Sequence, residues 1–259
     1  MSRVRLLPEI PRYIVCMIKN GIILSGGEGT RLRPLTNVVN KHLLGVNGKF
    51  IIDYPLNTLK QMGVENLTVV LGGNHFSQVV GHIKDGLAHG FKTCNYVYQG
   101  EAKGIAQAIQ LCRRYVDNDD QFAVILGDNL FDEPIHFPKL VGAQIVLKSV
   151  PDPKRFGVAF CDSEMTIMDI KEKPLTLDPR YQPLAITGCY SFDYHYFDLF
   201  HHLQPSARGE FEITDLIKLY YHDRECSSQI YNNFWSDMGT HESIAQCNQY
   251  FYAKQNGNT

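Results

Sequence analysis

Apolar residues in the first half of the chain recur with two different spacings. Short apolar runs, typical of strands buried in a sheet, alternate with longer stretches that carry apolar residues at helical spacing. This pattern predicts strands at 18–24, 67–71, 95–98 and 122–126, and helices at 52–62, 75–87 and 104–115. Alternating strands and helices are typical of a doubly wound parallel sheet. The sequence therefore predicts an α/β, Rossmann-like layer, in which ligands bind at the carboxyl ends of the strands.

The second half of the chain is richer in strands. Its pattern predicts strands at 143–150, 157–161, 166–170, 185–192 and 227–232, and helices at 194–202, 213–222 and 240–254. We expect these strands to continue the same sheet, which would then be a mostly parallel mixed sheet with a β-rich portion. No linker or repeat divides the sequence, so we predict a single domain at 17–259. Residues 1–16 are predicted to be an N-terminal extension, because Pro8, Glu9 and Pro11 interrupt what would be a signal peptide.

Composition and charge argue against several classes of protein. The 259 residues include 25 basic and 27 acidic side chains, and this net charge of −2 offers no electrostatic footprint for a nucleic acid or a membrane surface. No apolar run approaches the ~20 residues that span a bilayer. Seven scattered cysteines without a CxxC pair argue against disulfides or a zinc site and for a reducing compartment. We therefore expect a cytoplasmic protein that binds neither nucleic acid nor membrane.

A glycine-rich turn follows the first predicted strand. Gly26, Gly27 and Gly29 let the backbone turn tightly, and the N–H groups of such a turn point at anions. Arg31 and Lys41 add positive charge that a turn alone does not require. The segment is neither a Walker loop nor a dinucleotide fingerprint, because both motifs need a glycine where this chain has Arg31 or the leucine after it. The residues predict a phosphate site, with an ordinary turn carrying surface cations as the alternative.

Two aspartates follow predicted strands in separate parts of the chain. Asp128 ends the run Val-Ile-Leu-Gly-Asp, and Asp237 lies in Trp-Ser-Asp-Met-Gly-Thr-His. Mg²⁺ typically takes one or two carboxylates together with phosphate oxygens and waters, so two aspartates brought to one cleft suit a magnesium–nucleotide site. Each aspartate also has an alternative role that involves no metal. In that alternative, Asp128 is a turn residue and Asp237 is the N-cap of the helix near Thr240.

Several motifs stand in the order found in a known enzyme family. They are G-x-G-T-R-L-x-P-L-T with a later K-x-L-L, then Q-G-E-A-K-G, L-G-D-N, R-F-G-V, E-K-P, I-T-G-C-Y, S-A-R-G-E-F-E-I-T-D and W-S-D-M-G-T-H. Over about residues 19–252 the chain resembles the sugar-phosphate nucleotidylyltransferases, and among them the glucose-1-phosphate thymidylyltransferases most closely. Long bacterial members continue with further helices beyond the position of Thr259, so the resemblance is to the short form.

The resemblance implies a fold, a reaction and a cofactor. The fold is the GT-A-like nucleotidyltransferase fold, with a nucleotide-binding part at about 17–135 and a sugar-phosphate-binding part at about 136–259. The reaction transfers a thymidylyl group from dTTP to glucose 1-phosphate, giving dTDP-glucose and pyrophosphate for deoxysugar and surface-polysaccharide precursors. The implied cofactor is Mg²⁺, held by Asp128 and Asp237, and the implied assembly is a homo-oligomer.

The resemblance also assigns roles to individual residues of this chain. The residues implied in catalysis are Arg31, Lys41 and Lys173. Those implied in nucleotide binding are Gly26, Gly27, Gly29, Thr30, Gln99 and Gly104. Those implied in sugar-phosphate binding are Asn129, Gly157, Glu172, Lys173, Ile186, Tyr190 and Arg208.

The chain departs from the family pattern in four places. Gly45 and Phe50 stand where relatives usually have prolines, Phe156 replaces a tyrosine, and Met238 replaces a threonine. The lost tyrosine hydroxyl removes a hydrogen-bonding group near the sugar, worth on the order of 1 kcal/mol. The identity of the sugar is therefore less firmly predicted than the nucleotide chemistry.

Three other functions remain open from the sequence. A UTP-dependent sugar-1-phosphate uridylyltransferase fits the same residues, because uracil and thymine offer the same imide edge to the donors and acceptor of Gln99. A non-catalytic sensor of nucleotide sugars fits the fold, but it would be expected to have lost Arg31, Lys41 or the aspartates. A glycosyltransferase fits less well, because Asp128 is followed by Asn and Leu, without the second carboxylate of a D-x-D motif.

Overall fold

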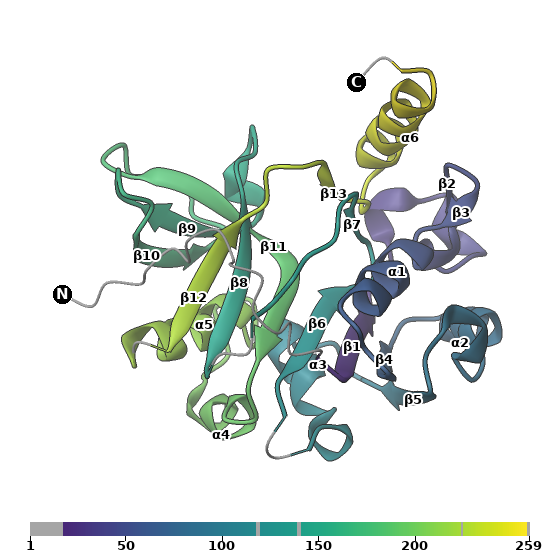
Figure 1. The fold of residues 1–259 in the computed structure, drawn as a ribbon, viewed down its shortest axis with the longest axis horizontal. Helices are drawn as coiled ribbons and strands as arrows, with labels where there is room; N and C mark the ends of the chain where they lie inside the picture. The colour runs from purple at the N-terminus through teal and green to yellow at the C-terminus, as the bar shows by residue number, and fades with distance from the viewer. Residues whose placement is uncertain (1–17, 118–119, 139–140, 224, 258–259) are drawn as a thin grey trace.

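A nine-stranded sheet forms the centre of the molecule (Figure 1). The computed structural model describes residues 18–117, 120–138, 141–223 and 225–257, so the predicted extension at 1–16 lies outside the described residues. The strand order is β10-β9-β11-β6-β1-β4-β5, with β8 paired to β11 and β12 paired to β8. These strands are β1 (Asn20–Ser25), β4 (Asn66–Leu71), β5 (Thr93–Tyr98), β6 (Phe122–Leu126), β8 (Ala143–Lys148), β9 (Gly157–Cys161), β10 (Ile167–Glu172), β11 (Gln182–Phe192) and β12 (Cys226–Ile230).

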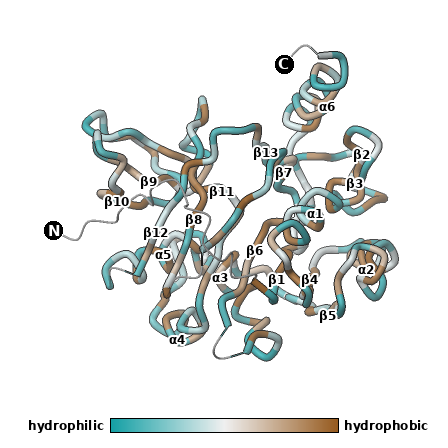
Figure 2. The backbone as a smooth tube through the Cα atoms, in the orientation of Figure 1, coloured by the Kyte–Doolittle hydropathy of each residue, from teal (hydrophilic) through white to brown (hydrophobic). Residues whose placement is uncertain are grey.

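Each face of this sheet is covered by its own apolar core. Ile22 and Leu24 of β1 belong to one core and Ile23 to the other, as the alternation of side chains along a strand requires. On the Ile23 face lie α1 (Asp53–Gln61) and α2 (Phe76–Ile83). The opposite face carries α3 (Ile105–Gln110), α4 (Tyr196–Leu199) and α5 (Ile213–His222). Figure 2 shows hydrophobic residues along the central strands. Because β1 runs parallel to both β4 and β6, the predicted doubly wound layer is confirmed.

The β-rich second half continues the same sheet, as predicted. β11 runs antiparallel to β6, β8 and β9 and so joins the two halves. Its register with β8 shifts between Ile186 and Tyr190. Gly188 lies within this break, where an added Cβ would fall 2.6 Å from Leu126 at the end of β6. The ladder is therefore irregular at the strand ends where a ligand is expected.

Two predicted helices are shorter than their apolar spacing suggests. The helix expected at 75–87 ends at Ile83, because Lys84 adopts a φ of 54°, which a right-handed helix does not contain. The helix expected at 104–115 ends at Gln110 and is followed by a separate 3₁₀ turn, Arg113–Tyr115.

Two short sheets are not predicted by the apolar pattern, because strands of two or three residues carry no measurable period. One pairs β7 (Asn129–Phe131) with β13 (Trp235–Asp237). The other is a hairpin of β2 (Gly45–Val46) and β3 (Lys49–Phe50), with positive φ at Asn47 and Gly48, as a two-residue hairpin turn requires. Gly45 and Phe50, which depart from the family pattern, form the end pair of this hairpin.

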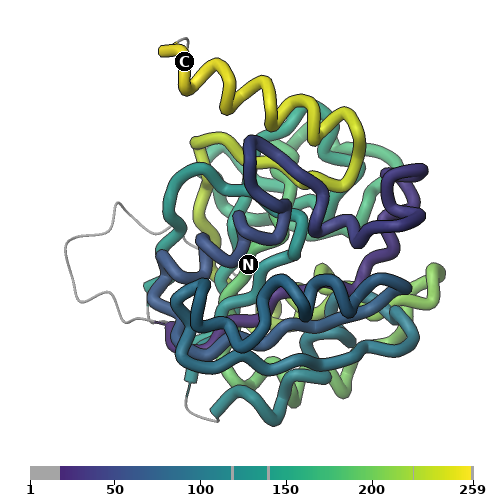
Figure 3. The backbone as a smooth tube through the Cα atoms, turned by 90° about the vertical axis from the view of Figure 1, so that its right-hand side faces the viewer, coloured from purple at the N-terminus to yellow at the C-terminus, as the bar shows by residue number. Residues whose placement is uncertain are grey.

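The last helix, α6 (His241–Gln255), projects from the body of the molecule (Figure 3). Thr240 caps it, since the Thr240 hydroxyl accepts the Ser243 N–H and the Ser243 hydroxyl accepts the Thr240 N–H. This capping box excludes the alternative in which Asp237 is the N-cap. In the parts of the chain that the structure describes, every helix is too short or too polar to cross a bilayer.

Candidate active site

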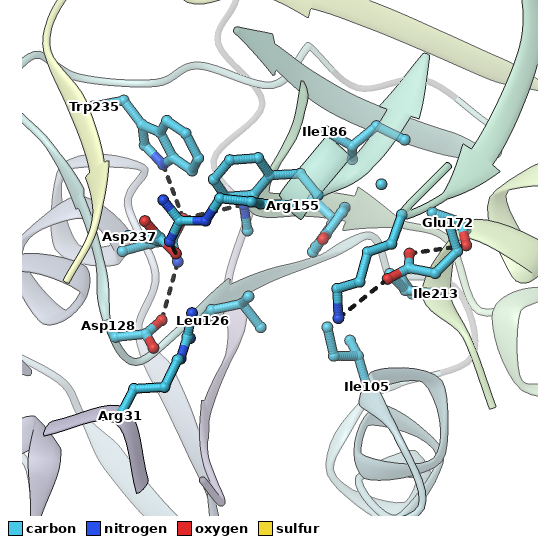
Figure 4. Close-up of a pocket in the computed structure, with 17 residues that line it drawn as sticks. Arg31, Ile105, Leu126, Asp128, Arg155, Glu172, Ile186, Ile213, Trp235 and Asp237 are labelled. Carbon is cyan, nitrogen blue, oxygen red and sulfur yellow. Dashed lines mark hydrogen bonds and ion pairs between the residues drawn. The ribbon is translucent and has the colours of Figure 1, made fainter. Parts of the chain in front are cut away.

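Two adjoining pockets contain most of the residues that the sequence singles out. The aspartate pocket is lined by residues that include Arg31, Asp128, Asn129, Gly157, Glu172, Lys173, Ile186, Tyr190 and Asp237 (Figure 4). The glycine pocket is lined by residues that include Gly26, Gly27, Lys41, Gln99 and Gly104. Asp128 lines both pockets. Asp128 follows β6 and the glycine turn follows β1, so the site lies at the strand ends where a doubly wound sheet binds its ligands.

A largely buried ion pair lies where the two pockets meet. The Nζ of Lys41 lies 2.6 Å from Oδ2 of Asp128, and the two side chains are 14% and 13% exposed. Burial alone would raise the pKa of Asp128, but the Lys41 ammonium and further hydrogen bonds outweigh it and hold that pKa well below its usual range. Asp128 is therefore ionised at any physiological pH.

His42, the neighbour of Lys41, is a neutral side chain that forms hydrogen bonds with other residues of this region. It is 1% exposed, and its Nδ1 lies 2.8 Å from the Ser25 hydroxyl and 2.9 Å from Oδ1 of Asn40. Burial and the adjacent Lys41 charge lower its pKa to about 3. Gly127 accommodates the imidazole, because an added Cβ there would lie 2.9 Å from the ring.

Asp237 lies at the end of β13, directly opposite Asn129 of β7. Burial, reinforced by the negative charge of Asp128, raises the pKa of Asp237 to about 6. Arg155 and Arg31 act in the other direction, and Arg155 places its Nη2 3.9 Å from Oδ2 of Asp237. The two carboxylates thus repel each other across the pocket, and cations surround them.

Two glycines of the turn lie close to neighbouring side chains, and at Gly29 a positive φ also favours glycine. An added Cβ at Gly26 would lie 2.6 Å from Oε1 of Gln99, and one at Gly29, whose φ is 66°, would lie 2.8 Å from Cβ of Lys41. Gly29 and Thr30 are not among the residues that line either pocket. Thr30 instead begins the 3₁₀ turn that carries Arg31 into the aspartate pocket.

Gln99 follows β5 and lines the glycine pocket together with Gly104. The Gln99 amide donates to Oε1 of Gln107 at 2.9 Å and to the Gly104 carbonyl at 3.4 Å. Gly104 has a φ of 98°, and an added Cβ would lie 2.5 Å from the Phe211 carbonyl oxygen. Only glycine fits at position 104, and the missing side chain leaves the N-terminal end of α3 open toward the pocket.

On the far side of the aspartate pocket, Glu172 ends β10 (Figure 4). Lys173 follows it in the chain and lines the same pocket. The Glu172 carboxylate accepts the Thr214 hydroxyl at 3.2 Å and lies 3.6 Å from the Lys173 ammonium. Burial, together with the negative charge of Glu212, raises the pKa of Glu172. A Cβ at Gly157 would lie 2.5 Å from Thr214, so glycine keeps this wall of the pocket thin.

Arg208 is not among the residues that line the aspartate pocket. Its guanidinium donates to Glu212 at 2.8 and 3.1 Å and to Oε1 of Glu172 at 3.3 Å. The implied contact of Arg208 with a sugar phosphate stays a prediction. In this structure Arg208 holds Glu172 in place.

Several residues that line the aspartate pocket were not singled out as site residues from the sequence, among them Arg155, Thr214 and Trp235. Arg155 and Thr214 stand inside quoted motifs, Arg155 two residues before Gly157 and Thr214 within the segment of Arg208, so their position was the available signal. Trp235 precedes Asp237 by two residues, which places both side chains on the same face of β13. A strand assignment for 235–237 would have identified it.

The comparison with protein families agrees with this geometry. The family model described as "Nucleotidyl transferase" matches residues 20–254. The chain belongs to the nucleotidyl transferase family. That match includes both pockets and both aspartates.

Individual members of the nucleotidyl transferase family resemble the chain over most of its length. The low-salt glycan biosynthesis nucleotidyltransferase Agl11 of Haloferax volcanii is 35% identical over 88% of this chain, which spans 65% of that protein's length. A glucose-1-phosphate thymidylyltransferase of Neisseria meningitidis is 34% identical over 91% of this chain and 83% of its own.

Among solved structures, a putative glucose-1-phosphate thymidylyltransferase from Bacillus anthracis has a TM-score of 0.82 and 39% identity. The match covers 90% of this chain and 94% of that one. A UDP-glucose pyrophosphorylase in complex with UDP-glucose has a TM-score of 0.77 at 23% identity, over 92% of this chain and all of the other. This second likeness shows that the fold is shared.

Proposed function

We propose that this protein transfers a thymidylyl group from dTTP to glucose 1-phosphate, giving dTDP-glucose and pyrophosphate. The observation that carries the proposal is the meeting of two chemically different pockets at Asp128. The glycine pocket offers amide groups suited to a pyrimidine and a phosphate chain, and the aspartate pocket offers a carboxylate and a lysine suited to a sugar phosphate. Similarity to the Neisseria enzyme over most of the chain supports this choice of substrates.

The proposed chemistry needs charge and alignment more than reactive side chains. An anionic oxygen of the sugar phosphate attacks the α-phosphorus of dTTP in line with the leaving pyrophosphate. One P–O bond forms to the sugar phosphate and one breaks to pyrophosphate, so the transfer itself requires neither a proton nor a protein nucleophile. Lys173 would hold the sugar phosphate, and Arg31 with the amides of the glycine turn would hold the pyrophosphate. Lys41 would offset the repulsion between the two anionic reactants.

The two aspartates fit Mg²⁺, which we propose as the cofactor. The described residues contain no group of three or more His, Cys, Asp or Glu side chains arranged to hold a metal. Two carboxylates suit Mg²⁺, because this ion completes its coordination with phosphate oxygens and waters. The raised pKa of Asp237 beside Asp128 also reflects a repulsion that a divalent cation would relieve. Asp128 and Asp237 would hold the ion, which supplies positive charge to the phosphates when bound.

Pyrophosphate release tests the proposal and its main competitor together. Each of dTTP, UTP and the other nucleoside triphosphates would be paired with glucose 1-phosphate, its 2-acetamido analogue and galactose 1-phosphate. We expect the highest kcat/KM with dTTP and glucose 1-phosphate. A higher kcat/KM with UTP would replace the proposal by a uridylyltransferase, since Gln99 meets the same imide edge in both bases. No release with any pair would favour the sensor.

A further inference from the structure

Asn129 is connected by hydrogen bonds to the elements that carry both aspartates. It follows Asp128 in the sequence, pairs with Asp237 across the β7–β13 ladder, and is 1% exposed. The resemblance to thymidylyltransferases implies a contact between Asn129 and the sugar phosphate. Its hydrogen bonds indicate a different role.

The orientation of the Asn129 amide is fixed by its donors. Its Oδ1 accepts the Trp235 indole N–H at 2.8 Å and the Gly188 backbone N–H at 3.1 Å. Both partners are donors only, so each needs the oxygen of the amide and not its nitrogen. A flipped amide would leave two buried N–H groups without an acceptor, at a cost of about 1–3 kcal/mol each. The nitrogen of Asn129 therefore points in the one remaining direction.

That direction is toward Asp128. The Nδ2 of Asn129 donates to Oδ1 of Asp128 at 3.1 Å, while Oδ2 of the same carboxylate faces Lys41. The two oxygens of Asp128 thus have separate partners, and the bond from Asn129 fixes the rotation of the carboxylate. Oδ2, which faces Lys41, is the oxygen left for an ion or for Lys41.

The other end of the same amide reaches the strand of the second aspartate. Trp235 lies two residues before Asp237 in β13, so fixing its indole also fixes the strand that presents Asp237. A backbone bond from the Met238 N–H to the Asp128 carbonyl oxygen, 2.8 Å long, closes this arrangement. One buried amide therefore contacts the first carboxylate directly and the strand of the second through Trp235.

We infer that Asn129 is a positioning residue for the metal site, which orients Asp128 and aligns β13 so that both carboxylates can hold a divalent cation. The inference rests on the proposed Mg²⁺ role of Asp128 and Asp237. Partners of this kind, behind the ligands of a metal, typically change metal affinity by 10- to 100-fold when they are removed.

The test measures Mn²⁺ binding to the full chain without substrates, from the paramagnetic resonance of free Mn²⁺, for the wild type and the variants Asn129→Ala and Trp235→Phe. We expect the Mn²⁺ dissociation constant to rise roughly tenfold or more in Asn129→Ala. A smaller rise is expected in Trp235→Phe, which keeps the aromatic ring but removes the donor that orients the amide. The matched control is Thr187→Val, which loses a buried hydrogen bond on β11 (Thr187 hydroxyl to Val146 carbonyl, 2.9 Å) without touching either aspartate. It should bind Mn²⁺ as the wild type does.

The outcomes separate this inference from the proposed function. Unchanged Mn²⁺ affinity in Asn129→Ala, with a raised KM for glucose 1-phosphate, would overturn the inference and return Asn129 to a sugar-phosphate contact. If Asn129→Ala does not fold, unchanged Mn²⁺ affinity in Trp235→Phe overturns the inference instead. An equal loss of affinity in Thr187→Val would also overturn it, because the effect would then be general. A wild type that binds no Mn²⁺ overturns the metal assignment itself, which the variants alone cannot do.

Discussion

Lys41 and Asp128, 87 positions apart in the sequence, form an ion pair of 2.6 Å at the junction of the two pockets. The pair neutralises two largely buried charges before any substrate is present. A phosphate chain that draws Lys41 away would leave Oδ2 of Asp128 facing the nucleotide, where the proposed reaction needs it. The same pair therefore stabilises the fold and holds Asp128 where the proposed reaction needs it.

Replacement of Lys41 by Met should lower both the turnover and the free energy of unfolding. Turnover should fall by roughly a hundredfold or more, as for other lost transition-state contacts. The free energy of unfolding should fall by about 3 kcal/mol, because the Asp128 carboxylate is left buried without its partner. Urea unfolding and pyrophosphate release measure the two effects. The double variant Lys41→Met with Asp128→Asn should recover stability and stay inactive; failure to recover stability would show that the pair is not coupled.

Asp237→Asn should make the protein more stable and less active. The folded-state pKa of about 6 lies above the ordinary value of 3.8, so the ionised carboxylate is disfavoured in the fold and costs stability above pH 6. An uncharged amide removes that cost, on the order of 1–3 kcal/mol at pH 8, and the gain should shrink as the pH falls toward 4. Thermal unfolding at pH 8 and pH 5 checks the gain. Turnover should fall at least a hundredfold, comparable to the loss of other charge-stabilising groups; a variant with normal turnover would refute the metal role.

His42 should make the stability of the protein depend on pH. Its pKa is about 3 in the fold and 6.5 in the unfolded chain, so between these values the unfolded state binds the extra proton. Stability should therefore fall as the pH drops below 6.5, by about 2 kcal/mol between pH 7 and pH 5 from this group alone. Urea titrations across this range measure it. In His42→Gln this contribution should disappear, and an unchanged pH profile would show that His42 is not its source.

Gln99→Ala should weaken the binding of the nucleotide and leave the binding of the sugar phosphate unchanged. Losing the imide contacts should raise the KM for dTTP on the order of tenfold, with the KM for glucose 1-phosphate unchanged. Gln107→Ala is the matched control, because Gln107 accepts the Gln99 amide at 2.9 Å but is not among the residues that line the glycine pocket. It should change the KM for dTTP by less than about threefold. Equal effects of both variants would argue against base recognition by Gln99.

The sequence predicted which residues gather at the site better than it predicted what they contact. Strands such as 67–71 and 122–126 could be predicted because buried runs of apolar residues have few alternatives. Asp128 and Asp237 stood out because of the motifs around them. The Lys41–Asp128 ion pair and the hydrogen bonds of the buried Asn129 side chain could not be predicted. A motif specifies residue types and their spacing, but it does not specify which atoms make contact.

Arg208 is a second residue whose motif did not predict its contacts. Its motif resembles the family closely, yet its guanidinium lies against Glu212 and Glu172 and outside the aspartate pocket. The carboxylates of Glu172, Glu210 and Glu212 all form ion pairs with the Arg208 guanidinium. Nearby carboxylates compete with a phosphate for an arginine, and sequence spacing does not decide between them. The short strands β7 and β13 escaped prediction for a simpler reason, since three residues are too few to show a period.

The pairing of β7 with β13 has a consequence for how the protein is made. A chain emerging from the ribosome presents its N-terminal elements first, so the glycine turn, Gln99 and Asp128 are all available before β13 is synthesised. Asp237 joins them only when β13 has been added, just before α6 begins at its Thr240 cap. A chain that stops before β13 can thus bring the glycine turn, Gln99 and Asp128 together, but it lacks the second carboxylate. If Asp237 holds the metal as proposed, synthesis through β13 is a condition for catalysis.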